Sequence, residues 1–178
     1  MPNYLSDGRP DFKPRRDSLG VIPCYQFKGD LASELKSGAL DRAGAVTLLE
    51  DMLMIREFEE MIVKLRAGAY EPLPAFNYRG PTHLSIGQEA ASVGACAGTL
   101  AGDYITSTHR GHGDSIAKGC LGIRAMTEPQ IKARLKGAAD ALSGEALLEA
   151  ALEDHLYRTA AELFGKEDGY CKGRGGSM

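Results

Sequence analysis

The sequence lacks closely spaced cysteines. Its four cysteines stand far apart at irregular intervals, and no two of them form a Cys-x-x-Cys pair: Cys24, Cys96, Cys120 and Cys171. Structural zinc sites and the disulfide frameworks of small secreted domains need closer or more regular spacing. This absence argues against both and favours a reducing cytoplasm. Cys96 lies among alanines, so we expect it to be a small core residue.

Also missing are a basic patch, a long apolar run and a secretory leader. The formal net charge is −3, and no cluster of Lys and Arg with interleaved aromatic residues occurs, which argues against nucleic-acid binding. No apolar run reaches the length that crosses a bilayer. The N-terminal segment mixes charges with prolines and glycines and has no apolar centre, unlike a secretory signal. We therefore expect a cytoplasmic protein that binds neither nucleic acid nor membrane.

What the sequence does contain is a series of helical patterns after an arm, residues 1–40, that we expect to be extended. From Asp41 to about Ala67 apolar residues recur at steps of three and four, so Asp41 is the predicted helix cap and Gly68 the stop signal. Prolines and glycines predict a surface loop over 68–81. The alanine-rich segment 87–100 predicts a tightly packed helix. The apolar face of the first helix comprises Leu48, Met52, Ile55, Phe58, Ile62 and Leu65.

The most informative segment is the turn Thr108-His109-Arg110-Gly111-His112-Gly113. It follows a short β-like run, which predicts a strand near 103–107, and precedes a predicted helix through Lys118. Glycines allow close backbone approach, and arginine supplies a permanent forked charge. A following helix adds free N–H groups and the positive end of its dipole. By its chemistry this turn can hold a phosphate.

A second helical region covers Thr127 to Phe164, with a break at Ser143-Gly144. Thr127 is the predicted cap of its first half, with Pro129 in the first turn. The pattern predicts a helical hairpin, and its one histidine, His155, is expected to be exposed. One strand and several helices do not complete any β-containing class. The chain is therefore either largely α-helical or the opening part of a larger α/β unit.

Four ordered blocks resemble a known family: MLMIREFEEMIVKLRAGAY, HLSIGQEAASVGA, GDYITSTHRGHGDSIAKG and ELFGKEDGYCKGRGGSM. They are similar to the α part of thiamine-diphosphate-dependent 2-oxoacid dehydrogenases, and the Ser-Thr-His-Arg-Gly-His-Gly form looks closest to acetoin dehydrogenase α subunits. The resemblance implies an α/β fold of which residues 41–178 are an incomplete, mostly helical N-terminal part of a thiamine-diphosphate-binding domain. Residues 121–160, the hairpin, are an insertion relative to the family, as in forms in which α and β parts are fused.

The resemblance also implies a reaction and the residues that carry it. A thiamine-diphosphate enzyme of this family cleaves a 2-oxoacid or acetoin and passes the acyl group to a lipoyl carrier. His109 and Arg110 match positions at the cofactor's diphosphate, and His83 and His112 match positions at the reacting end, where imidazole can move protons. Each has a plainer interpretation: Arg110 as a turn arginine paired with a carboxylate such as Asp114, and the histidines as structural hydrogen-bonding groups.

Other parts of such an enzyme are not found in this sequence. The family binds Mg²⁺ and diphosphate through a Gly-Asp-Gly motif, which does not occur here. The activating glutamate comes from the β part, so Glu89 is not assigned that role; Gln88 and Glu89 are expected to brace the alanine-rich helix. We therefore expect an N-terminal piece whose Mg²⁺ ligands and β part lie elsewhere, with a lipoyl-bearing acyltransferase as a further partner and a hetero- or homo-oligomer as the assembly.

Several alternatives stay open at this point. The histidines with Asp114 could bind a metal, but the flanking glycines make helical ligand geometry doubtful, so no metal site is assigned. The basic glycine run Lys172–Gly176 is expected to be flexible and only adjacent to the site. The missing Gly-Asp-Gly motif favours a non-catalytic interaction module, and a transketolase-like part acting on sugar phosphates is a third reading. The substrate, acetoin, pyruvate or a branched acid, is not determined by the sequence.

Overall fold

The computed structural model describes residues 20–24, 26–68, 82–137 and 139–176, together with Pro14, Arg16 and Ser18. The loop predicted between Gly68 and Pro81 lies almost entirely outside these residues. Six helices form the described part of the chain: α1 (Leu31–Ser37), α2 (Arg42–Arg66), α3 (Glu89–Ala97), α4 (His112–Arg124), α5 (Glu128–Leu135) and α6 (Gly144–Leu163). None of them is both long and apolar enough to cross a membrane.

Helix α2 begins and ends close to the predicted residues. The Asp41 carboxylate accepts a hydrogen bond from the Gly44 N–H at 2.6 Å, which caps the helix as expected. Its apolar face packs on α3 and α4, and Cys96 of α3 is buried in the same core, as predicted. Arg124 at the end of α4 contacts both Asp51 carboxylate oxygens through Nη1, at 2.6 and 2.7 Å, and so ties α4 to α2.

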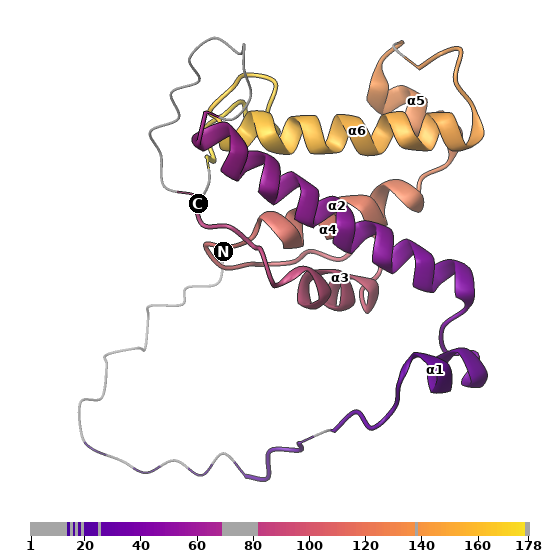
Figure 1. Ribbon diagram of the computed structural model, residues 1–178, viewed down its shortest axis with the longest axis vertical. Coiled ribbons are helices and arrows are strands. Elements are labelled where there is room, and N and C mark those ends of the chain that lie inside the picture. The colour runs from indigo at the N-terminus through magenta and orange to yellow at the C-terminus, as the bar shows by residue number, and fades with distance from the viewer. Residues whose placement is uncertain are drawn as a thin grey trace, which may run out of the picture.

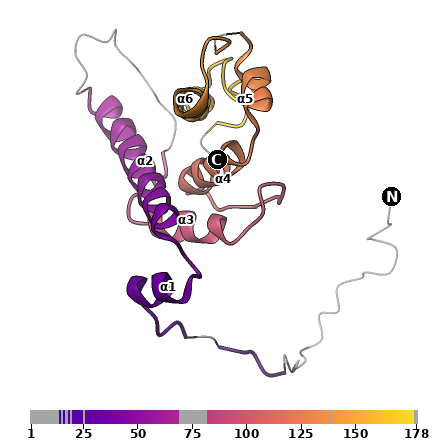
Figure 2. The same cartoon turned by 90° about the vertical axis from the view of Figure 1, so that its right-hand side faces the viewer.

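Helix α4 lies at the centre of the fold, with α2 and α3 on one side and α6 on the other (Figures 1 and 2). Ile116, Ala117 and Cys120 of α4 join the first core cluster, while Ile123 joins a second cluster with residues of α5 and α6. Burial raises the pKa of the Cys120 thiol to about 12, so this cysteine is a neutral core residue. The position of α4 places its first turn between helices α2 and α3 on one side and helix α6 on the other.

The helical hairpin is present, with α5 packed on α6, but α5 is shorter than predicted. It ends at Leu135 because Lys136 and Gly137 adopt left-handed backbone conformations, with φ of 50° and 73°. This conformation is a common helix stop. Thr127 begins α5 as predicted, with its N–H donating to the Gln130 side chain at 2.8 Å.

Two expectations differ from the structure. Residues 103–107 form no strand, and none occurs among the described residues, since a strand needs a neighbouring strand to satisfy its backbone. The 1–40 segment is not wholly extended, because residues 31–37 form α1, held by a reciprocal cap between Asp30 and Ser33. Helix α1 has no buried residue and lies apart from α3–α6 (Figure 2).

Candidate functional site

The histidine-arginine turn is held by Ser85, a residue that the sequence analysis did not single out. Ser85 is fully buried, its hydroxyl donates to the Arg110 carbonyl at 2.8 Å, and it accepts from the Gly113 N–H at 3.1 Å. The Arg110 guanidinium turns back and donates through Nη1 to the Leu84 carbonyl at 2.7 Å. The HLSIGQEA block and the turn therefore form one hydrogen-bonded unit.

His83 and His109 lie together on this unit. Their rings meet edge to face, with centroids 4.9 Å apart and planes at 89°. His109 is exposed and His83 is partly buried. Two of the predicted site residues, one from each block, are thus neighbours in space although 26 positions separate them in the sequence.

His112 is the first residue of α4, and it is buried against α2. Its Nδ1 lies 2.9 Å from Oε1 of Glu59, a carboxylate with no exposed surface, while His112 itself is 5% exposed. The second carboxylate oxygen of Glu59 and the Nε2 atom of His112 are both buried and have no hydrogen-bond partner among the described residues. A buried acid–imidazole pair with two open positions is unusual, because buried polar atoms are nearly always paired.

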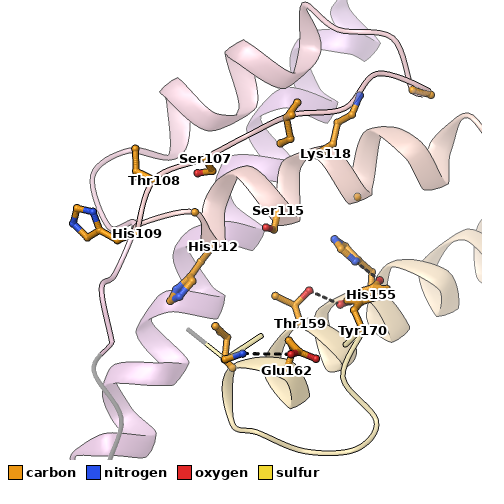
Figure 3. A pocket seen from close by; sticks show the side chains of 16 residues that line it. Ser107, Thr108, His109, His112, Ser115, Lys118, His155, Thr159, Glu162 and Tyr170 are labelled. Carbon is orange, nitrogen blue, oxygen red and sulfur yellow. Dashed lines mark hydrogen bonds between the residues drawn. The ribbon is translucent and has the colours of Figure 1, made fainter. Parts of the chain in front are cut away.

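A cavity of about 540 Å³ lies between the first turns of α4 and the end of α6 (Figure 3). One side, which we call the α4 wall, is formed by residues 105–119 and contains His109 and His112. The other side, the α6 wall, is formed by the last turns of α6 and the loop at 170–176. Within the α4 wall, helix α4 begins at His112. Its N-cap residue, Gly111, gives the first helical N–H groups no side-chain hydrogen-bond acceptor.

Several polar groups of the α4 wall are already paired. The Ser107 hydroxyl donates to Asp114, which lies in the first turn of α4. Lys118 donates to the Thr99 hydroxyl at 3.0 Å and to the Leu100 carbonyl, so it holds the end of α3. These contacts leave the two histidines as the chemically distinctive side chains of this wall.

His155 is buried in the α6 wall, which corrects the expectation that it is exposed. It is 5% exposed, and its Nδ1 lies 2.6 Å from the Tyr170 hydroxyl, which also accepts from Arg134 of α5 at 2.5 Å. Its ring packs against α4 at Gly119, where any larger side chain would overlap it. Burial is the main cause that lowers the pKa of His155.

The basic glycine loop folds around a carboxylate at the α6 wall of the cavity. Glu162 of α6 accepts four backbone N–H groups, from Cys171 at 2.7 Å, Gly173 at 2.9 Å, Gly175 at 2.6 Å and Gly176 at 3.3 Å. Partial burial acts to raise the pKa of Glu162, but these donors outweigh it and hold the pKa below its ordinary value. The amides of this loop are thus occupied by a side chain of the same molecule.

The structure brings only some of the predicted residues to the cavity. His109 and His112 line it, whereas Arg110 and His83 do not: Arg110 donates to the Leu84 carbonyl, and His83 packs against the His109 ring. Glu89 braces its helix as expected: it accepts from the Gly87 N–H at 3.0 Å and from Arg56 Nε at 2.6 Å. Over the described residues, no three His, Cys, Asp or Glu side chains converge as metal ligands.

Glu59, Ser85, His155 and Glu162 are the residues that sequence reasoning missed. Two of them, Glu59 and His155, could have been found from their helical spacing in the sequence. Glu59 falls on the same helix face as Ile55 and Ile62, so a carboxylate was present within an apolar stripe. His155 lies four residues after Ala151 and eight after Leu147, both fully buried, which puts it on the inner face of α6.

Comparisons with known proteins agree with the motifs. The chain is 37% identical over 140 residues to the alpha subunit of acetoin:2,6-dichlorophenolindophenol oxidoreductase of Bacillus subtilis, covering 79% of this chain and 30% of that protein. It is 33% identical over 140 residues to the Cupriavidus necator protein of the same name (78% and 29%). It is 32% identical over 165 residues to a pyruvate dehydrogenase E1 component subunit alpha of Porphyra purpurea (93% and 33%).

The matched residues define the chain first as a relative of dehydrogenase alpha subunits. More particularly, over those residues it is similar to alpha subunits of acetoin:2,6-dichlorophenolindophenol oxidoreductase and of the pyruvate dehydrogenase E1 component, which confirms the resemblance drawn from its sequence blocks. The chain spans about a third of the length of these curated relatives. No family model matches it, and no solved structure does so.

Proposed function

We propose that this chain is part of the alpha side of a thiamine-diphosphate-dependent enzyme that cleaves acetoin or a 2-oxoacid and passes the acyl group to a lipoyl carrier. The observation that carries the proposal is the 37% identity over 140 residues, 79% of this chain, to an acetoin oxidoreductase alpha subunit. Acetoin is favoured over pyruvate because the relatives with that name share the higher identity.

The residues at the start of α4 suit the diphosphate of thiamine diphosphate. The cavity opens at the N-terminus of α4, where helix N–H groups favour an anion, and His109 stands at its edge. One nitrogen of Arg110 donates to the Leu84 carbonyl, and the remaining donors of its fork suit two phosphate oxygens after a small reorientation. We assign His109 and Arg110 to the diphosphate, and His83 and His112 to the reacting end. The cofactor, when bound, supplies the electron sink for carbon–carbon cleavage.

The remaining parts of the site belong to other polypeptide. We propose that the Mg²⁺ ligands and the activating glutamate come from further chain or from a β part. The outer face of α2 supports a partner there, because it exposes a row of large apolar side chains at helical spacing. These are Val46, Leu49 and Leu53, each about half exposed.

An acetoin-dependent dye assay tests this function. With its partner chain present, the protein should reduce 2,6-dichlorophenolindophenol when given acetoin, thiamine diphosphate and Mg²⁺. Arg110→Ala should raise the cofactor concentration for half-maximal rate by about tenfold or more, because it removes a bidentate donor. Arg42→Ala, at the exposed start of α2, is the matched control and should leave it unchanged. No reduction with acetoin or any 2-oxoacid would favour the non-catalytic interaction module instead.

A further inference from the structure

The pair formed by Glu59 and His112 is the feature that the proposed function does not yet use. It joins the middle of α2 to the first residue of α4 through a single contact, Oε1 to Nδ1 at 2.9 Å. Both side chains are more than nine-tenths buried, and His112 lines the cavity. Each keeps one polar atom without a partner among the described residues, Glu59 Oε2 and His112 Nε2.

With one proton shared between the two side chains, the contact can be made in two ways that differ in the position of that proton. A second proton would give an imidazolium–carboxylate ion pair, in which Nε2–H is a buried donor without a partner among the described residues. If Glu59 is protonated, it donates to Nδ1, and the imidazole proton is then on Nε2, where it is a buried N–H without an acceptor. If Glu59 is ionised, Nδ1–H donates to it, and neutral His112 keeps a lone pair on Nε2. In the protein backbone, buried N–H groups without a partner are rarer than acceptors without one. The buried charge of the second arrangement is stabilised by the Nδ1–H group that donates to it, and this arrangement leaves only acceptors without a partner.

We propose that Glu59 is a positioning residue: it holds His112 in the Nδ1–H tautomer, so that Nε2 is a basic nitrogen ready to accept a proton from a hydroxyl group in the cavity. This proposal rests on the proposed function for the identity of the ligand, a hydroxyketone such as acetoin, but not for the state of the pair.

The proton balance of this step is simple. The O–H bond of the ligand breaks, its proton forms an N–H bond at Nε2, and the electron pair stays on the ligand oxygen. His112 becomes an imidazolium whose Nδ1–H still donates to the Glu59 carboxylate, so the new positive charge lies against a buried negative one. A 2-oxoacid substrate carries no hydroxyl, so it has no need of this proton transfer.

The tautomer can be observed directly by ¹⁵N NMR of histidine-labelled protein, with the His112 signals assigned through their loss in His112→Asn. The expected spectrum shows Nδ1 protonated and Nε2 unprotonated near neutral pH. Glu59→Gln should raise the Nε2–H form, because the amide can donate to Nδ1. Glu57→Gln, an exposed position on the same helix, should change nothing. An Nε2–H tautomer or an imidazolium at His112 in the unmodified protein would overturn the proposal, and this spectrum suffices even if Glu59→Gln fails to fold.

Kinetics separate positioning from a merely structural role. Glu59→Gln should lower kcat with acetoin by about 10- to 100-fold with little change in KM, as expected when a general base is misaligned. With pyruvate the loss should be smaller. Equal losses for both substrates, with the fold intact by circular dichroism, would contradict the assignment. If the protein shows no activity but the Nδ1–H tautomer responds to Glu59→Gln, the proposed function fails and the positioning of His112 stands.

Discussion

The two walls of the cavity differ in what their polar groups do. On the α6 wall, the Glu162 carboxylate is enclosed by four backbone amides, and the Tyr170 hydroxyl is shared by His155 and Arg134. One ring nitrogen of His155, Nε2, has no partner there among the described residues. On the α4 wall, His112 also has an Nε2 without a partner, and its buried neighbour Glu59 of α2 adds an unpartnered carboxylate oxygen. The two carboxylates therefore differ: Glu162 is satisfied by backbone amides, which suits support of the loop, whereas Glu59 has a single contact, to a histidine that lines the cavity.

The largest expected effect comes from forcing the two walls apart. A Cβ added at Gly119 of α4 would overlap the His155 ring, lying 2.8 Å from Cδ2 and closer still to Nε2. Gly119→Ala should therefore destabilise the fold by roughly 1–3 kcal/mol, the usual range for overpacking, measured by denaturant unfolding. Gly122→Ala, on the same helix with no atom within 4 Å of the added Cβ, is the control and should be neutral or slightly stabilising. Equal effects at both positions would show that the walls do not meet at His155.

A smaller effect should follow from weakening the α6 wall alone. Glu162→Gln replaces a carboxylate that accepts four N–H groups with an amide that also presents donors to them. We expect hydrogen exchange at the Gly173 and Gly175 amides to become faster by roughly tenfold, with Glu153→Gln on the exposed face of α6 as control. The His112 tautomer should not change. Unaltered exchange at these amides would mean that Glu162 does not order the loop.

The same contact gives a pH dependence with a definite sign. Because the folded-state pKa of Glu162 lies below its ordinary value of 4.5, its contribution to loop order is present above pH 4.5. That contribution is lost as the pH falls through the lower folded value. Amide protection of the loop should follow this course in the unmodified protein and be insensitive to acid in Glu162→Gln. Protection that falls already on going from pH 7 to pH 5 would contradict it.

The smallest effect concerns the ion pair between Arg56 of α2 and Glu89 of α3. The Arg56 hydrogen bond is the main cause that holds the pKa of Glu89 at about 2. Its stabilising effect should be full above pH 4.5 and lost only as the pH falls through about 2. Arg56→Ala should move that loss toward pH 4.5, seen as an acid-unfolding midpoint at higher pH. Arg66→Ala, exposed near the end of α2, should leave the midpoint in place.

Local signals predicted the helices well. Asp41 caps α2, Thr127 begins α5, and the periodic apolar residues of both long helices face the core. The strand expected at 103–107 failed because β-like residues form a strand only beside a partner strand. The end of α5 was missed because Lys136 adopts a left-handed conformation that its residue type rarely takes.

The site was predicted in part, for a related reason. A turn rich in histidine and glycine is visible as a local motif, so the sequence pointed to His109 and His112, which line the cavity; their roles stay a prediction. Glu59 lies 53 positions from His112 in the sequence, and Ser85 lies 25 positions from Arg110 and 28 from Gly113. No local sequence pattern predicts contacts over such separations. His155 was assigned to the surface because a single polar residue in a helical pattern usually faces water. Its spacing from Leu147 and Ala151 indicated the inner face instead.

Cofactor affinity tests the central claim most directly. Thiamine diphosphate should be titrated calorimetrically, with Mg²⁺, into the protein assembled with its partner chain, and into the His109→Ala and Arg110→Ala forms. The account predicts saturable binding that weakens by about tenfold or more in each variant and is unchanged in Arg42→Ala. Binding of equal strength in all four proteins, or no binding in any, would contradict the assignment of the α4 wall to the cofactor.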